Sequence, residues 1–189
     1  MRIEALGIAG AFSVRIEPVG DLRGLFARTF CVDEFAAAGL PTEMVQSSIS
    51  FNTRRGTVRG IHFQWPPSRE GKLVRCLRGA VFDVLLDLRP DSPSYLRHAA
   101  VALDDVNRDA IFIPHGVAHG FQTLADSTEV LYQMTDRYAP ELASGVRWND
   151  PSFGIEWPIA SDVVISERDA HYPDFDQAAY ESDFARRRR

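Results

Sequence analysis

Five short segments of the sequence contain polar side chains that a β-strand does not need in order to fold. They are Arg59–Gln64, Gly71–Arg75, Pro114–Phe121, Glu129–Tyr132 and Ser166–Asp169. Between them they offer imidazoles, an ammonium group, a phenol, guanidinium groups and carboxylates. These are the groups that enzymes use to move protons and to hold anionic substrates.

Taken one at a time, these residues also have structural explanations. His62 lies among apolar strand residues, and Lys72 opens a strand directly after a glycine. The two-residue period of a strand places Tyr132 on an apolar face, so its side chain could simply be buried with a hydrogen-bond partner. Asp169 could cap a final turn, whereas His119 follows a Pro-x-Gly-x-x-His pattern typical of a turn that leads into a strand. The interpretation therefore depends on the set rather than on any single residue.

The elements that must position these side chains are mostly short strands. Alternation of apolar and polar residues predicts strands at 12–16, 25–31, 47–52, 57–64, 72–77, 80–88, 98–103, 111–113, 118–123 and 128–135. Turn-forming Gly, Pro and Asp residues separate them, and two helices are predicted, over Val32–Ala38 and Phe175–Phe184. Many short strands at close spacing indicate an all-β fold, an antiparallel sandwich or barrel.

Composition narrows the class of protein. The 189 residues are 45% hydrophobic and 25% charged, which is typical of one globular domain spanning 1–189. A net charge of −5 argues against a nucleic-acid partner. No apolar run reaches the roughly 18 residues of a membrane helix. Two cysteines form no disulfide framework, so we expect a cytoplasmic protein, with Arg186–Arg189 as a solvated basic tail.

In combination, the motifs resemble the dTDP-4-dehydrorhamnose 3,5-epimerase family over most of the chain. The matching stretches follow in order: Asp21-Leu-Arg23-Gly24-Leu-Phe26, Arg59-Gly-Ile-His62-Phe-Gln64, Gly71-Lys72-Leu-Val-Arg75, Gly79-Ala-Val-Phe-Asp83, Asp87-Leu-Arg89, Ile113-Pro-His-Gly116-Val-Ala-His119-Gly-Phe121, Tyr132, Tyr138-Ala-Pro140, Trp148-Asn-Asp150 and Gly154-Ile-Glu-Trp-Pro158. The resemblance implies a cupin-type jelly-roll fold, with N-terminal strands shared in a homodimer.

The resemblance also implies a substrate and a reaction. The substrate would be a nucleoside diphosphate linked to a 4-keto-6-deoxyhexose, and the enzyme would remove and return protons at C3, at C5 or at both. His62 would be the base, Asp169 its partner and Tyr132 the acid across the sugar ring. Lys72 would stabilise the enolate oxygen. No cofactor and no metal are implied.

The remaining residues carried over from the family would bind the substrate. Arg59 and Arg23 are candidates for the diphosphate, because a guanidinium fork matches phosphate oxygens. His119 would contribute beside the base, and Phe26 would line the pocket. The same resemblance adds three further substrate-binding residues: Gln46, Tyr138 and Trp148.

Some positions depart from the family pattern. Arg28 and Ala143 stand where acids are usual, and Gln46-Ser47-Ser48 replaces a common Gln-Asp-Asn. Arg59 and His62 are also three residues apart, so a regular strand would point them to opposite faces. A bulge at Gly60 would remove that difficulty.

Two alternatives from other classes stay open on the sequence. A metal-dependent cupin would use His62 and His119, but such sites usually read His-x-His, and here position 64 is Gln. A non-catalytic sugar-nucleotide binding module would have lost His62, Tyr132 or Asp169, and all three are present.

Overall fold

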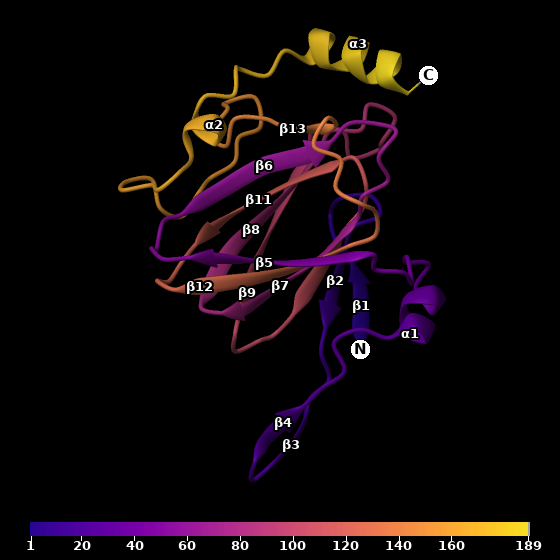
Figure 1. The fold of residues 1–189 in the computed structure, drawn as a ribbon, viewed down its shortest axis with the longest axis vertical. Coiled ribbons are helices and arrows are strands. Elements are labelled where there is room, and N and C mark those ends of the chain that lie inside the picture. Colours follow the sequence, from indigo (N-terminus) through magenta and orange to yellow (C-terminus); the bar gives the residue numbers. More distant parts are fainter. Residues whose placement is uncertain (189) are drawn as a thin grey trace.

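The structure, a computed structural model that describes residues 1–188, consists of two β-sheets that face each other (Figure 1). The six-stranded sheet has the order β1-β2-β10-β7-β12-β5, and the five-stranded sheet has the order β13-β6-β11-β8-β9. Adjacent strands in both sheets pair antiparallel. The strands of the six-stranded sheet are β1 Arg2–Ala5, β2 Phe12–Arg15, β5 Gln46–Asn52, β7 Lys72–Arg78, β10 Ala110–Ile113 and β12 Thr128–Met134. Those of the five-stranded sheet are β6 Val58–Gln64, β8 Ala80–Asp87, β9 His98–Asp104, β11 Val117–Thr123 and β13 Ala143–Gly145. The predicted all-β jelly-roll fold is confirmed.

Three apolar clusters hold the layers together. The first lies between the sheets and includes Val74, Leu85, Phe121 and Val130. The second covers the outer face of the five-stranded sheet, where the C-terminal segment packs on it through side chains such as Phe153 and Tyr180. The third lies under the first helix, on the outer face of the six-stranded sheet. Because β8 and β11 are covered on both faces, nearly all of their residues are buried.

The strand predicted over 25–31 is wrong beyond its first residues. Only β4, Gly24–Phe26, forms, and it pairs with β3, Val19–Asp21, in a two-stranded hairpin. Figure 1 shows this hairpin as an arm that projects from the body of the molecule. Residues 27–31 have no sheet beside them to complete their hydrogen bonds, so they stay irregular.

The structure has three helices within residues 1–188: α1 Val32–Ala37, α2 Glu167–Ala170 and α3 Gln177–Arg187. Arg186 to Arg188 of the predicted solvated basic tail are exposed, and they belong to the end of α3. The first two form the last turn of α3, where cations favour the helix dipole, and Arg188 pairs with Asp91. Arg189 lies outside the described residues. None of the described helices has the length and apolar character to cross a membrane.

The bulge predicted at Gly60 is present in β6. Arg59 and His62 are three residues apart on β6, but they pair with Phe121 and His119, which are only two residues apart on β11. Gly60 has a φ of 120°, and a Cβ there would lie 2.5 Å from the Cα of Gly120. Only glycine fits this combination of backbone angle and close approach. The extra residue lets Arg59 and His62 point into the same space between the sheets.

Candidate active site

A cavity of about 360 Å³ lies between the two sheets and contains most of the predicted catalytic side chains. β6 of the five-stranded sheet contributes His62 to its lining. The facing six-stranded sheet contributes Lys72 from β7 and Tyr132 from β12. The full lining is Gln46, Ser48, His62, Phe63, Gln64, Glu70, Lys72, Tyr132, Met134, Tyr138, Ala143, Ser144 and Arg168. An imidazole and a phenol therefore reach one cavity from opposite walls.

His62 is held by a carboxylate from the far end of the chain. Its Nε2 lies 2.7 Å from Oδ1 of Asp169, which is buried, while the imidazole is 44% exposed. The other carboxylate oxygen, Oδ2, accepts the amide of Gly60 at 3.2 Å. Burial opposes ionisation of Asp169, but the hydrogen bond and charge of His62 outweigh it, so the pKa of Asp169 is lowered. The pair leaves Nδ1 as the ring nitrogen free to take a proton.

Tyr132 faces a second histidine–carboxylate pair. Its ring packs edge-on against His119, with the centroids 5.8 Å apart. Nε2 of His119 lies 2.8 Å from Oδ1 of Asp83, and both side chains are buried. Burial and the negative charge of Asp83 raise the pKa of Tyr132, while Arg59 opposes them. Tyr132 is therefore a protonated phenol at neutral pH, in the state that donates a proton.

Lys72 meets a buried carboxylate at the cavity wall. Its Nζ lies 2.6 Å from Oε1 of Glu70, and both side chains are largely buried. In register, Lys72 lies opposite Met134 of β12, one period beyond Tyr132. The pair places a cation on the same inward face as the phenol.

Three other predicted residues lie at or beside this cavity. Gln46 and Tyr138 line it, and the Gln46 side chain accepts the amide of Tyr138 at 3.3 Å. Arg59 extends from β6 toward the facing sheet, where its Nε donates to Oδ1 of Asn52 at 2.7 Å. Arg59 is not among the lining residues, but it belongs to the same strand as His62, and its charge opposes the rise in the pKa of Tyr132.

Three more do not meet at this chain's cavity. Arg23 and Phe26 lie on the projecting β3–β4 arm, where Arg23 pairs with Asp21 and Phe26 is 81% exposed (Figure 1). Trp148 packs against Trp157 in the C-terminal layer, with the centroids 5.8 Å apart. Trp148 is not among the residues that line the cavity, and its contact with substrate stays a prediction.

The departures from the family pattern fall in two places. Ser48 and Ala143 both line the cavity. Both are small where the family pattern has larger polar side chains, which leaves the cavity wider there. Arg28 lies away from the lining, and its Nη1 donates to Oε1 of Glu34 at 2.9 Å.

Sequence reasoning missed three groups of the site. Glu70 holds Lys72, Asp83 holds His119, and Arg168 lines the cavity next to Asp169 in α2. A signal existed for Asp83, since an acid inside an apolar strand needs a partner. None existed for Glu70, which lies in a polar loop. For the metal-dependent alternative, residues 1–188 contain no cluster of three or more His, Cys, Asp or Glu side chains placed to hold a metal ion.

Comparison with known proteins matches the chain to a family. The family model described as dTDP-4-dehydrorhamnose 3,5-epimerase matches residues 5–177. The chain belongs to this family. A dTDP-4-dehydrorhamnose 3,5-epimerase of Methanothermobacter thermautotrophicus is 44% identical over 165 residues, which cover 86% of this chain and 88% of that relative. Members of the dTDP-4-dehydrorhamnose 3,5-epimerase family are isomerases with a cupin-like β-fold, as expected from the motifs.

Two further relatives of this epimerase family member bear on its chemistry. A dTDP-4-dehydrorhamnose 3-epimerase of Streptomyces niveus is 41% identical over 170 residues, covering 89% of this chain and 81% of the relative. The crystal structure of NovW, a 4-keto-6-deoxy sugar epimerase from the novobiocin biosynthetic gene cluster of Streptomyces spheroides, superposes with a TM-score of 0.90 at 38% identity, covering 97% of this chain and 90% of NovW. Sequence identity does not separate the relative named for two centres, at 44%, from the relative named for one, at 41%.

Proposed function

We propose that this chain epimerises a nucleoside-diphosphate 4-keto-6-deoxyhexose, of the dTDP-4-dehydro-6-deoxyglucose type, at C3, at C5 or at both. One observation carries the proposal: His62, paired with Asp169, and Tyr132, protonated by its environment, line one cavity from opposite sheets. Inversion at a carbon requires a base on one face of the sugar and an acid on the other. The class of sugar nucleotide is inferred from the names of the relatives, which refer to dTDP-4-dehydrorhamnose and to a 4-keto-6-deoxy sugar.

Proton removal is the first step of the proposed mechanism. The 4-ketone acidifies the hydrogens on C3 and C5, and Nδ1 of His62 takes one of them. The electron pair of the broken C–H bond moves into the enolate, whose oxygen was the ketone. The ionised Asp169, 2.7 Å from Nε2, stabilises the imidazolium that forms.

Return of a proton on the other face completes the inversion. Tyr132 donates its phenolic proton to the carbon, and the ketone is restored. The tyrosinate then recovers a proton from solvent, and the His62 imidazolium releases its proton to solvent. Lys72 places its ammonium beside the enolate oxygen, where fixed positive charge lowers the barrier. No electron is gained or lost overall, so the proposed reaction needs no redox cofactor.

The diphosphate would lie toward Arg59, at the edge of the cavity. Arg23 and Phe26 reach a cavity only if the projecting arm of one chain lies against a second chain. The arm exposes Val19, Leu22 and Phe26, each more than 70% exposed, which is costly for an isolated hairpin. We therefore place the arm in a homodimer, where it completes the partner's nucleotide site. The free thiols of Cys31 and Cys76 fit a cytoplasmic enzyme.

Incubation with dTDP-4-keto-6-deoxyglucose in deuterated water tests the proposal. We expect NMR to find deuterium at C3, at C5 or at both, together with an inverted product. Label with inversion at both centres identifies a 3,5-epimerase, and label with inversion at C3 alone identifies a 3-epimerase. A substrate recovered with neither label nor inversion would contradict the proposal.

A further inference from the structure

A second and larger cavity lies at one end of the barrel, outside the site described above. It encloses about 690 Å³ and is lined by the β6–β7, β8–β9 and β10–β11 connections together with α3. Gln64 is the residue that lines both cavities. Cavities of this size hold ligands as large as a nucleotide. The walls supplied by Phe184 and Arg188 follow residue 177, where the family match ends.

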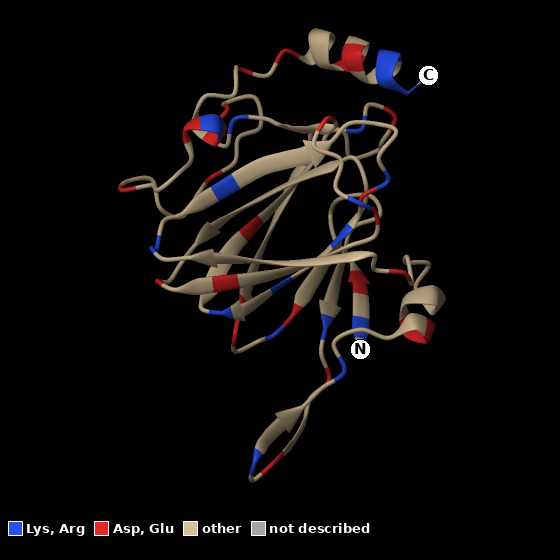
Figure 2. Cartoon of the chain, in the orientation of Figure 1, with Lys and Arg blue, Asp and Glu red and all other residues tan. Residues whose placement is uncertain are grey.

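The polar part of this lining is mostly basic. Arg69, Arg89, Arg188 and His115 all contribute to it, while Asp91 is the carboxylate at its surface. Asp91 is already paired with Arg188. Figure 2 shows the corresponding last turn of α3 in blue, next to these connections. Asp87 balances Arg89 and Asp91 balances Arg188, so Arg69 is the net positive charge that remains in this lining.

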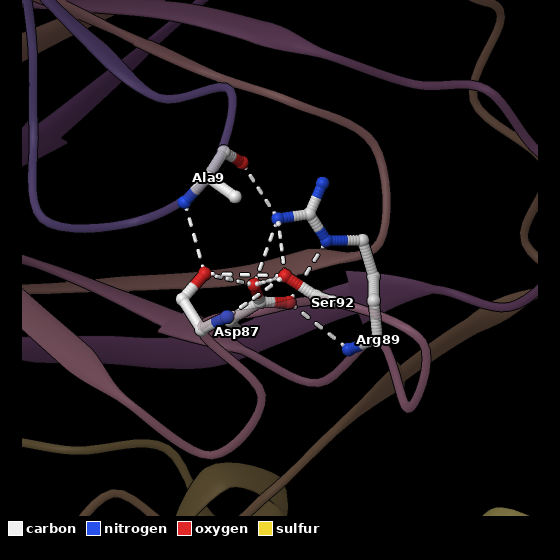
Figure 3. A network of polar contacts seen from close by, with 5 residues as sticks. Ala9, Asp87, Arg89 and Ser92 are labelled. Atoms are coloured by element: carbon white, nitrogen blue, oxygen red, sulfur yellow. Dashed lines mark hydrogen bonds and ion pairs between the residues drawn. The ribbon is translucent and has the colours of Figure 1, made fainter.

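Arg89 is fixed in a geometry that leaves one donor free. Its Nε and Nη2 donate to the two oxygens of the buried Asp87, each at 2.8 Å, and Nη2 also donates to the carbonyl of Ala9 at 2.7 Å. Figure 3 shows Nη1 pointing away from this network. In residues 1–188 no acceptor lies within hydrogen-bond distance of Nη1. A guanidinium locked in this way binds an oxyanion at little entropic cost.

Two other side chains of the lining, those of Arg69 and His115, are exposed to solvent. Neither the guanidinium of Arg69 nor the imidazole of His115 has a hydrogen-bond partner in the part of the chain that the structure describes. His115 lines the same cavity as Arg89 and Arg69, and partial burial together with their charges lowers the pKa of its imidazole. The Nε2 of Gln64 is also buried without a partner, although its Oε1 accepts the amide of Ala139 at 3.0 Å.

We propose that this cavity binds a phosphate-bearing small molecule, held by Arg69, Arg89 and His115. Phosphate oxygens are the acceptors that match several guanidinium donors at once. A ligand of this class would occupy the unused donors and balance the surplus positive charge. The proposal does not depend on the epimerase activity, because its residues other than Gln64 lie outside the first cavity.

NMR titration of the His115 ring tests this site directly, with the signal assigned by its loss in His115→Gln. Inorganic phosphate and a nucleoside diphosphate are added separately, against sodium chloride of equal ionic strength. We expect a saturable shift with at least one probe, and the tighter probe identifies free phosphate or a nucleotide as the ligand class. Arg69→Ala should weaken the dissociation constant about tenfold, since one charge-assisted contact is lost.

Two variants serve as controls for this titration. Arg55→Ala removes one equally exposed positive charge from the β5–β6 loop and should leave the affinity unchanged. Arg59→Ala, at the edge of the epimerase cavity, should also leave the His115 shift unchanged. The proposal is overturned if neither probe shifts the ring saturably, or if Arg69→Ala and Arg55→Ala bind equally well. In residues 1–188 the Arg69 side chain makes no hydrogen bond or ion pair, so the melting temperature of Arg69→Ala should match that of the wild type.

Discussion

Asp169 links the catalytic base to the stability of the fold, because one carboxylate binds both His62 and the Gly60 amide. Asp169→Asn should lower kcat by about 10²-fold to 10⁴-fold, the usual contribution of a positioned base. Asp162→Asn is a suitable control, since Asp162 is exposed with a φ of 57°, a conformation that asparagine accepts. Equal kcat values for both variants would contradict the role of Asp169.

The same substitution should change the pH dependence of unfolding. The folded-state pKa of Asp169 is lowered, so its ionised form stabilises the protein above the unfolded value of about 3.9. That contribution is lost as pH falls through the lower folded-state value. In urea unfolding near pH 7, we expect the free energy of unfolding of the wild type to exceed that of Asp169→Asn by about 1–3 kcal/mol. The gap should close as pH falls below that lowered folded-state pKa. A gap that persists at low pH would rule out the ionised carboxylate as its source.

Lys72 offers a way to separate catalysis from folding. Lys72→Met should lower kcat by about 10²-fold or more through loss of positive charge at the enolate. It should also destabilise the protein by about 3 kcal/mol, because the buried Glu70 carboxylate loses its partner. In the double variant with Glu70→Gln, we expect stability to recover while activity stays low. Recovery of both would mean that Lys72 is only structural.

At this scale the sequence predicted the groups that carry recognisable chemistry. His62, Lys72 and Tyr132 line one cavity, in agreement with the shared site that the family resemblance implied. Asp83 and Glu70 were missed as partners, since pairing across strands depends on register. Register is set by the whole sheet and is not visible in a local motif.

The bulge in β6 is the element on which the site geometry depends. Gly60→Ala would place a Cβ 2.5 Å from the Cα of Gly120 and 2.8 Å from the carbonyl oxygen of His119. Backbone atoms cannot move away as a flexible side chain does. We expect a loss of about 3 kcal/mol or more in stability, from strain and overpacking together. At Gly7 an added Cβ meets nothing within 4 Å, so the free energy of unfolding of Gly7→Ala should lie within about 1 kcal/mol of the wild-type value. Similar melting of both variants would contradict this account of Gly60.

Most long strands were predictable, but the short elements were not. The seven-residue strands carry enough alternating positions to be recognised. β13 has three residues and pairs with β6 only because the chain returns to that edge. α2 has four residues, and its start depends on the Ser166 hydroxyl accepting the Asp169 amide at 3.1 Å. Elements this short are stabilised by their tertiary neighbours rather than by their own sequence.

At the scale of the whole molecule, the projecting arm predicts assembly. β5 is an edge strand whose Ile49 and Phe51 are more than half exposed, and the arm adds further apolar surface. We expect sedimentation at about 10 µM to give twice the mass of one chain, because an obligate interface is tight at that concentration. Replacing Leu22 and Phe26 by serine should weaken the dimer and raise KM more than it lowers kcat. A wild-type monomer that is fully active would contradict the shared site.

The sequence could not place Arg23 and Phe26, because their positions depend on where the arm goes after it leaves its own sheet. Motif spacing records which residues belong to the site but not which chain supplies them. The same holds for α3, whose basic last turn was expected to be free in solvent. The helix packs on the sheet through Tyr180, which stacks on Trp65 with the ring centroids 4.8 Å apart, and the Arg187 guanidinium carbon lies 5.0 Å from the same Trp65 ring.

The most direct test of the central claim follows deuterium into dTDP-4-keto-6-deoxyglucose with wild type, His62→Ala and Tyr132→Phe compared side by side. If His62 removes the proton and Tyr132 returns one from the opposite sheet, His62→Ala should abolish exchange. Tyr132→Phe should keep exchange while inversion falls by about 10²-fold or more. Undiminished exchange in His62→Ala, or undiminished inversion in Tyr132→Phe, would contradict the account.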